Sequence, residues 1–211
     1  MGMTDSIDCA VIGAGVIGLA VARALALRGR EVIVIEANEA IGQGISSRSS
    51  EVIHAGIYYE TGSLKARLCV QGRDLLYDYC AGHGIGHRRC GKLIVATGEA
   101  EIATLKTLIG QAQANGVGDL EFLDGPEAES LEPGLKAAAA VLSPSTGIFD
   151  THAFMLALQG DAEAAGAAVA FHSPLRGGQG GTKHKVINVG GAEPLDLTCR
   201  TLVNAAGLGD Q

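Results

Sequence analysis

A glycine-rich run near the start of the chain constrains the fold more than any other feature. Gly13, Gly15 and Gly18 form a G-x-G-x-x-G pattern between an apolar stretch at residues 9–12 and a helical pattern. Glycines at this spacing allow a tight turn, close approach of the backbone to a pyrophosphate and close packing of helix on strand. The N–H groups and dipole of the helix N-terminus also attract phosphates. The run therefore predicts a dinucleotide-binding β-α-β unit.

An acidic residue stands where such a unit meets the ribose. Residues 32–35 read Val-Ile-Val-Ile, which is typical of a buried parallel strand, and Glu36 follows directly. A carboxylate at this position accepts a hydrogen bond from a ribose 2′-OH and repels a 2′-phosphate, so NADP is disfavoured. The alternative is a Rossmann-like unit that packs in this way without a nucleotide.

Composition and charge exclude several classes of partner. The 211 residues carry a formal net charge of −7, and the scattered basic residues offer no footprint for nucleic acid or an anionic membrane. The five cysteines form no C-x-x-C pair, so we expect buried thiols in a reduced cytoplasmic protein, and no metal site. Arg23 interrupts the apolar stretch 9–27, and Asp5 and Asp8 precede it, so we expect no targeting or transmembrane segment.

Hydrophobic spacing predicts the order of the remaining elements. A Gly- and Ser-rich loop, residues 38–50, follows the first unit. The middle of the chain is expected to form a helix at 63–79, a strand at 92–96, a helix at 102–112 capped by Thr97, and short strands around a Pro-rich turn at 120–149. The last part is expected to form a helix from Asp150 or Thr151 to 165, strands at 168–171, 183–189 and 195–199, and a strand and turn at 201–207. The middle stretch alternates strand, helix and strand without a phosphate loop. It therefore indicates an inserted second domain.

Four further segments carry a more specific signal, namely residues 47–59, 63–69, 90–96 and 146–150. The string S-E-V-I-H-A-G-I-Y-Y, from Ser50 to Tyr59, is the most specific of them. Together with the glycine-rich run, these segments resemble the FAD-dependent oxidoreductases of the D-amino-acid oxidase (DAO) type, and within them the L-2-hydroxyglutarate dehydrogenase/oxidase group. The likeness extends along essentially the whole chain.

The resemblance implies a fold and a cofactor. The fold class would be α/β, a Rossmann-like FAD-binding domain with a parallel sheet and a β-meander, interrupted by an inserted and incomplete α+β substrate domain. The FAD-binding domain would comprise residues 1–85 and 150–211, and the substrate domain residues 86–149. Family members are far longer, so the resemblance also implies that the 211-residue chain is truncated at its C-terminus and, by itself, poorly active or inactive.

The implied cofactor site runs through several segments. The FAD would lie against Gly13, Ala14, Gly15, Val16, Ile17, Gly18, Glu36, Ala37, Ser46, Ser47, Arg48, Ser50, Leu175, Ala206 and Gly207. In that arrangement the serines would meet the pyrophosphate, Leu175 would border the adenine, and the flavin ring would abut residues 54–59. Serine hydroxyls and an arginine suit phosphate oxygens, although a Ser-rich turn is also an ordinary solvated turn.

The implied reaction is FAD-dependent oxidation of a small 2-hydroxy acid, L-2-hydroxyglutarate by preference, with hydride transfer to flavin N5. We expect His54 to accept the hydroxyl proton, because an imidazole titrates near neutral pH. The competing interpretation is a core histidine satisfied by a backbone carbonyl or a flavin oxygen. Tyr58 and Tyr59 would either donate to a substrate carboxylate or simply pack.

The anchor for the substrate carboxylate is harder to choose. Lys65 and Arg67 lie on a predicted helix with an outward face and are expected to be solvated, whereas Arg89 or Lys92 could face the substrate.

Two other functions stay open. One is FAD-dependent oxidation of an amine such as glycine or sarcosine, since fold alone does not choose the substrate. The other is an inactive, nucleotide-binding truncated product. Neither the electron acceptor nor the oligomeric state can be read from the sequence.

Overall fold

The computed structural model describes residues 5–181 and 183–209. The chain forms two compact units, each with its own core. The first unit joins Met1–Ser49 to Thr151–Gln211, and the second unit is Ser50–Asp150.

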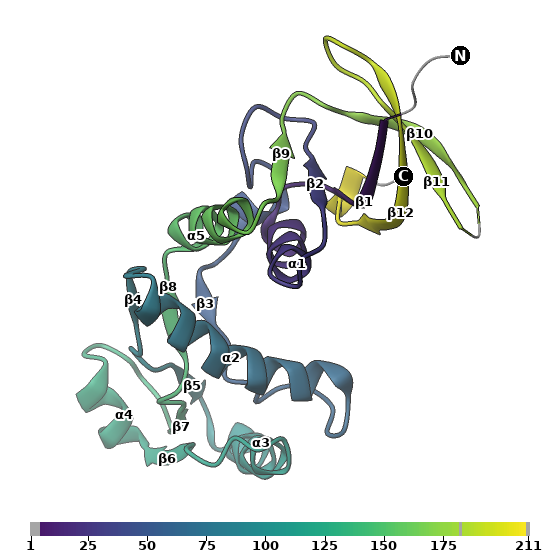
Figure 1. Cartoon of the computed structure of the whole chain (residues 1–211). Helices are drawn as coiled ribbons and strands as arrows, with labels where there is room; N and C mark the ends of the chain where they lie inside the picture. Colours follow the sequence, from purple (N-terminus) through teal and green to yellow (C-terminus); the bar gives the residue numbers. More distant parts are fainter. Residues whose placement is uncertain (1–4, 182, 210–211) are drawn as a thin grey trace. The chain divides into compact units, whose positions relative to one another are not determined.

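The first unit is built on a six-stranded sheet whose order is β10-β11-β12-β1-β2-β9 (Figure 1). Its strands are β1 (Asp5–Ile12), β2 (Val32–Ile35), β9 (Ala168–Ala170), β10 (Leu175–Gly180), β11 (Lys185–Val189) and β12 (Leu195–Asn204). Strands β12, β1, β2 and β9 are parallel, and β10, β11 and β12 form an antiparallel meander. The apolar runs of β1 and β2, residues 9–12 and 32–35, are mostly buried, as expected for parallel strands covered by helices.

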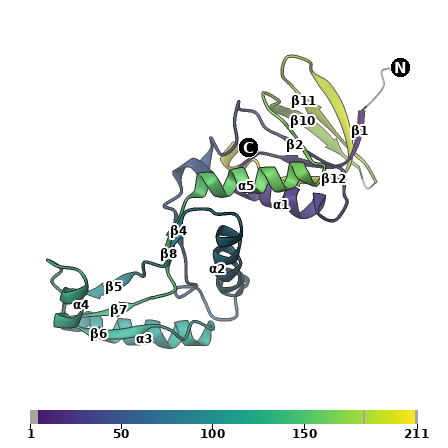
Figure 2. The same ribbon diagram turned by 60° about the vertical axis from the view of Figure 1, so that its left-hand side comes forward.

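Two helices of this unit, α1 (Val16–Ala26) and α5 (Thr151–Ala164), lie side by side (Figures 1 and 2). The Arg23 guanidinium donates to the Asp161 carboxylate at 2.6 Å and joins them. On the sheet, Ala10, Ile35 and Ile187 belong to one buried apolar cluster. This packing fixes the carboxyl ends of β1 and β2, where α/β sheets bind ligands.

The second unit contains two three-stranded antiparallel sheets, β3-β8-β4 and β5-β7-β6. Its elements are β3 (Val52–Ile53), α2 (Leu64–Gly82), β4 (His87–Arg88), β5 (Leu93–Ala96), α3 (Ile102–Ala114), β6 (Glu121–Asp124), α4 (Gly125–Leu131), β7 (Ala139–Leu142) and β8 (Gly147–Phe149). Helix α3 packs on the second sheet through Leu105, which clusters with Ala139 and Val141 (Figure 2).

The structure divides the chain differently from the expected limits. Residues 50–85 were expected to belong to the FAD-binding domain, but they lie in the second unit. Strand β3 pairs with β8, and the Tyr77 hydroxyl of α2 donates to the Ser145 carbonyl at 3.2 Å. These partners lie about 70 to 95 residues further along the chain, so only long-range pairing reveals them.

Four local expectations are corrected. The two strands expected at 195–199 and 201–207 are one strand, β12, because its backbone pairs with β1 along most of its length. Strand β10 was not expected, since its Gly-rich sequence lacks a strand pattern. Helix α4 was also missed, although Asp124 and Glu127 form a capping box. Thr97 does not cap α3. Its N–H and hydroxyl instead donate to the Glu101 carboxylate.

The cysteines are not all buried as expected. Cys9, Cys80 and Cys199 are buried, Cys69 is half-buried and Cys90 is exposed. Within residues 5–181 and 183–209, no group of His, Cys, Asp and Glu side chains could hold a metal ion. In the same part of the chain, no helix is both long and apolar enough to cross a membrane.

Candidate functional site

The glycine-rich turn packs closely against the backbone of Ile35 and Ala205. The Gly13 N–H donates to the Ile35 carbonyl at 2.8 Å, and the φ of Gly13 is +97°, which L side chains rarely adopt. A Cβ on Gly13 would lie 2.5 Å from the Ala205 carbonyl oxygen, and one on Gly18 would overlap the Gly13 carbonyl oxygen. Both glycines are therefore required by the packing of this unit itself.

The N-terminus of α1 retains the features of an anion site. Gly15 provides no side-chain cap, and the first turn contains no acidic residue. The Val16 N–H donates to Ser46 Oγ at 3.1 Å, and a Cβ on Gly15 would lie 3.0 Å from the same oxygen. Ser46 thus lies directly beside the helix N-terminus, where N–H groups and the dipole favour a phosphate.

Glu36 holds this turn together and retains the capacity for one more hydrogen bond. The carboxylate is buried, with 8% exposure. It accepts from the Ala14 N–H at 2.7 Å, from the Asn38 N–H at 2.9 Å and from the Asn38 side-chain amide at 2.8 Å. A carboxylate offers about four acceptor positions. These three bonds therefore leave Glu36 able to accept one hydroxyl donor.

A pocket of about 450 Å³ opens beside Glu36 at the ends of β1 and β2. Five predicted residues line it, namely Gly13, Glu36, Ala37, Leu175 and Ala206. Its walls also include Asn38, Ser173, Arg176 and Asn204, which the sequence did not indicate. Arg176 follows Leu175 on β10, so a prediction of that strand would have indicated Arg176 as a candidate site residue. The volume lies within the usual range for a small-molecule site.

The remaining predicted cofactor residues lie at different places. Ala14, Gly15, Val16, Gly18 and Ser46 form the turn and helix start described above. Ile17 is 65% exposed on α1. The Ser47 hydroxyl donates to the Gly44 carbonyl at 2.7 Å, and Arg48 is exposed at the end of the same short helix. Gly207 begins a final 3-10 turn, and Ser50 belongs to the second unit.

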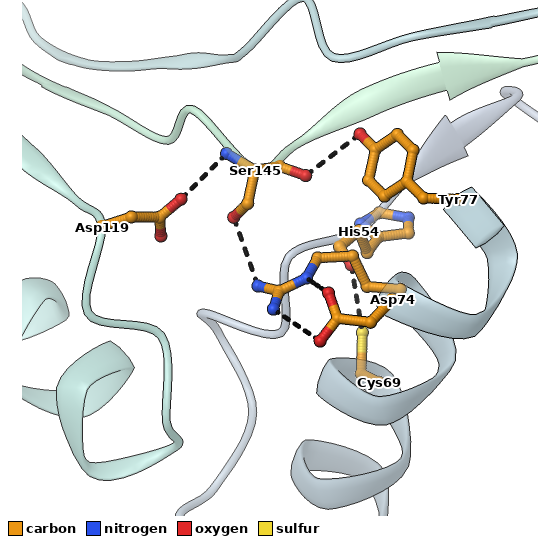
Figure 3. Close-up of polar contacts among 7 residues, drawn as sticks. His54, Cys69, Asp74, Tyr77, Asp119 and Ser145 are labelled. Atoms are coloured by element: carbon orange, nitrogen blue, oxygen red, sulfur yellow. Dashed lines mark hydrogen bonds and ion pairs between the residues drawn. The ribbon is translucent and has the colours of Figure 1, made fainter. Parts of the chain in front are cut away.

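In the second unit, a network of polar contacts joins α2 to the loop between β7 and β8 (Figure 3). Arg73 pairs with Asp74 at 2.7 Å and donates to Ser145 Oγ at 3.3 Å, and the Ser145 N–H donates to Asp119. Hydrogen bonding to Arg73 lowers the pKa of Asp74. With Tyr77 also bonded to Ser145, this network fixes the loop, and Arg73 is already paired with a carboxylate.

His54 follows β3 on the side of α2 that bears Cys69 (Figure 3). The Cys69 thiol donates to the His54 carbonyl at 3.6 Å, but the His54 side chain is exposed, so it is not a core histidine. Desolvation, and then the positive charges of Lys92 and Lys65, lower the pKa of the imidazole. A lowered pKa keeps the ring neutral at pH 7, the form that accepts a proton.

The family follows from comparison with known proteins. Residues 8–210 match the family model described as FAD dependent oxidoreductase (DAO). This chain belongs to the DAO family of FAD-dependent oxidoreductases. The match confirms the predicted family and its cofactor, FAD.

Similar proteins support the family from sequence and from structure. The DAO-family chain is 43% identical to the mitochondrial L-2-hydroxyglutarate dehydrogenase of Arabidopsis thaliana, over 98% of this chain and 49% of that relative. It is 35% identical to the Homo sapiens protein of the same name, over 97% and 47%. The chain thus spans about half the length of these relatives.

Two solved structures share the fold. L-α-glycerophosphate oxidase from Mycoplasma pneumoniae, with FAD bound, has a TM-score of 0.89 at 22% identity, covering 96% of this chain and 54% of that one. Glycine oxidase from Geobacillus kaustophilus has a TM-score of 0.84 at 27% identity, covering 97% and 56%. The predicted α/β fold of the FAD-binding type is confirmed.

The expected cytoplasmic location is contradicted, because the Arabidopsis thaliana and Homo sapiens relatives are named as mitochondrial proteins.

The residues of the first unit fit the adenosine and phosphate part of FAD. The glycines leave room where a Cβ would crowd Ser46 or Ala205, the start of α1 offers N–H groups, and Glu36 retains one acceptor position. These are the donors and the acceptor that a pyrophosphate and a ribose hydroxyl require.

Replacing Glu36 by Gln is expected to weaken FAD binding by about 1–3 kcal/mol and also to destabilise the first unit. The reason is that the new NH₂ group faces either the buried Ala14 N–H or the two part-buried Asn38 donors, so one side loses its acceptor. The measurements are the Kd for FAD, from quenching of flavin fluorescence, and the Tm of the apoprotein. Glu39→Gln, on an exposed neighbour, is the control. An unchanged Kd for Glu36→Gln would contradict the ribose role.

Proposed function

We propose that this protein uses FAD to oxidise a small 2-hydroxy acid, with L-2-hydroxyglutarate as the favoured substrate. The observation that carries the proposal is the 43% identity, over 98% of this chain, with a relative named L-2-hydroxyglutarate dehydrogenase. The turn at Gly13, the free acceptor position of Glu36 and the pocket beside them support the cofactor part of the proposal.

In the proposed reaction, each group of the chain has a simple task. Bound FAD supplies an acceptor for the two electrons that leave the substrate carbon. The start of α1 and Ser46 bind the phosphates, and Glu36 accepts a hydrogen bond from the ribose. The neutral imidazole of His54 accepts the proton of the substrate hydroxyl, and its lowered pKa keeps it in the required form at neutral pH.

A second candidate function is oxidation of an amine such as glycine. It is favoured by the solved glycine oxidase, which shares the fold at 27% identity. The two functions differ in the group that loses a proton, a hydroxyl in one and an amine in the other. A direct comparison of substrates therefore separates them.

The test is anaerobic mixing of the FAD-loaded protein with L-2-hydroxyglutarate and, separately, with glycine and sarcosine, while the flavin absorbance is followed. We expect L-2-hydroxyglutarate to bleach the flavin. A single reduction needs no electron acceptor, so it is visible even if turnover is poor. Bleaching by an amine alone would favour the second candidate. No bleaching with FAD still bound would leave a nucleotide-binding protein without turnover and would contradict the proposal.

A further inference from the structure

The turn that follows His54 is held by the side chains of Gln111, on α3, and of Asn115, the residue that follows this helix. Gln111 donates its side-chain amide to the carbonyls of Tyr58 and Tyr59, at 3.2 and 2.7 Å. Asn115 donates to the carbonyls of Gly56 and Tyr59, at 3.3 and 2.8 Å. With four such bonds, the backbone that carries the two tyrosine rings is fixed in place.

Two lysines from different elements lie on these two rings. The Lys65 ammonium, in the first turn of α2, is 4.6 Å from the centre of the Tyr59 ring. The Lys92 ammonium, just before β5, is 4.5 Å from the centre of the Tyr58 ring. An aromatic face attracts a cation but leaves its N–H donors available for an acceptor. Two ammonium groups thus lie over the rings of two neighbouring residues of the turn.

Neither ammonium is paired with a carboxylate of the described residues. In the same unit Arg73 pairs with Asp74, and Arg89 lies 4.0 Å from the centre of the Tyr77 ring. Both lysines, in contrast, act on His54, whose pKa they lower.

Two titratable side chains beside this turn are uncharged near neutral pH, whereas Glu60, which follows Tyr59, carries an exposed carboxylate. Desolvation raises the pKa of the Tyr59 hydroxyl and of the Cys69 thiol. The charges that act on His54 are those of the two lysines, and a dianion would balance them.

We propose that Lys65 and Lys92 form a binding site for a small dicarboxylate next to His54, with one ammonium for each carboxylate. This inference rests on the proposed function, which it deepens by assigning the anchor for a substrate that carries two carboxylates. Lys65 is exposed, as expected, and the proposal adds a ligand to it; the proposal also takes Lys92 rather than Arg89 as the second anchor. An ammonium–carboxylate contact is a charge-assisted hydrogen bond, which is stronger than a neutral one.

The test measures binding without turnover. The full chain, with its histidines isotopically labelled, is titrated with glutarate and with butyrate, and the His54 resonances, assigned through a His54→Gln variant, are followed by NMR. We expect glutarate to bind more tightly than butyrate. We also expect it to raise the pKa of His54, because a bound dianion offsets the lysine charges. Lys65→Gln and Lys92→Gln are each expected to weaken glutarate binding about tenfold.

Three comparisons control for structural effects. Lys106→Gln removes a lysine that also lies over an aromatic ring, 5.7 Å from the centre of Phe122, and should leave glutarate binding unchanged. Lys92→Arg keeps the charge and should retain binding. Circular dichroism verifies that each variant is folded. Equal affinity for glutarate and butyrate, or unchanged glutarate binding in both Lys→Gln variants, would overturn the proposal.

The glutarate titration and the flavin-bleaching test can fail independently of each other. If glutarate binds through the lysines but L-2-hydroxyglutarate leaves the flavin oxidised, only the proposed function fails. If the flavin is bleached while both Lys→Gln variants bind glutarate normally, only the dicarboxylate site fails.

Discussion

Replacing Gly18 by Ala is expected to destabilise the first unit by about 3 kcal/mol, the upper end of the usual cost of overpacking, and to abolish retention of FAD. A Cβ at this position would overlap the carbonyl oxygen of Gly13. That oxygen belongs to backbone, and the same turn is held by the Gly13 N–H bond to Ile35, so a small shift cannot relieve the overlap. Relief requires α1 to move away from β1, which dismantles the start of the helix where the phosphates bind. Chemical denaturation of the apoprotein and the flavin content after purification measure the two effects.

Gly160→Ala is the matched control for this experiment. Gly160 is also a helical glycine of the first unit, but it is exposed on α5, and a Cβ there would meet nothing within 4 Å. Alanine stabilises an open helical position by about 0.4–1 kcal/mol, so the sign of the effect is expected to reverse. If Gly18→Ala and Gly160→Ala changed stability alike, the argument from close packing in the glycine-rich turn would fail.

Replacing His54 by Gln is expected to slow reduction of the flavin by the hydroxy acid about 10²–10⁴-fold, with a much smaller change in KM. The loss falls on the rate because proton transfer contributes in the transition state rather than in substrate binding. Rapid mixing of the FAD-loaded variant with L-2-hydroxyglutarate gives the rate constant. His83→Gln, at the exposed end of α2, controls for the removal of a histidine from the same unit. Reduced FAD content with a normal rate in the loaded fraction would make His54 a packing residue.

The pH dependence of flavin reduction provides an independent measure of the same role. The neutral imidazole is the active form, so the rate should fall as the pH drops through the pKa of His54. Because desolvation, Lys92 and Lys65 lower that pKa in the free protein, the fall in kcat/KM, which reports the protein without bound substrate, is expected below the ordinary histidine value of about 6.5. In Lys92→Gln it should move to higher pH, since one positive charge is removed. A fall at the same pH in both proteins would contradict the assignment to His54.

Much of the first unit could be predicted from local pattern. The bond from the Gly13 N–H to Ile35, the pairing of β1 with β2 and the bond of Glu36 to Ala14 each join residues within about 25 positions of one another. Such patterns are legible because a buried parallel strand must be apolar throughout and a tight turn of positive φ favours glycine. The family resemblance, and with it FAD, depended on the same short segments.

The sequence alone determined the nucleotide-binding turn, its acidic partner and the family, because spacing along the chain carries that information. Tertiary structure alone decided what depends on contacts between distant segments. It joined two expected strands into β12, and it assigned residues 50–85 to the second unit. It also brought Lys65 and Lys92 onto the rings of neighbouring tyrosines. Sequence periodicity does not predict these lysine–tyrosine contacts, because they depend on how strands pair and helices pack.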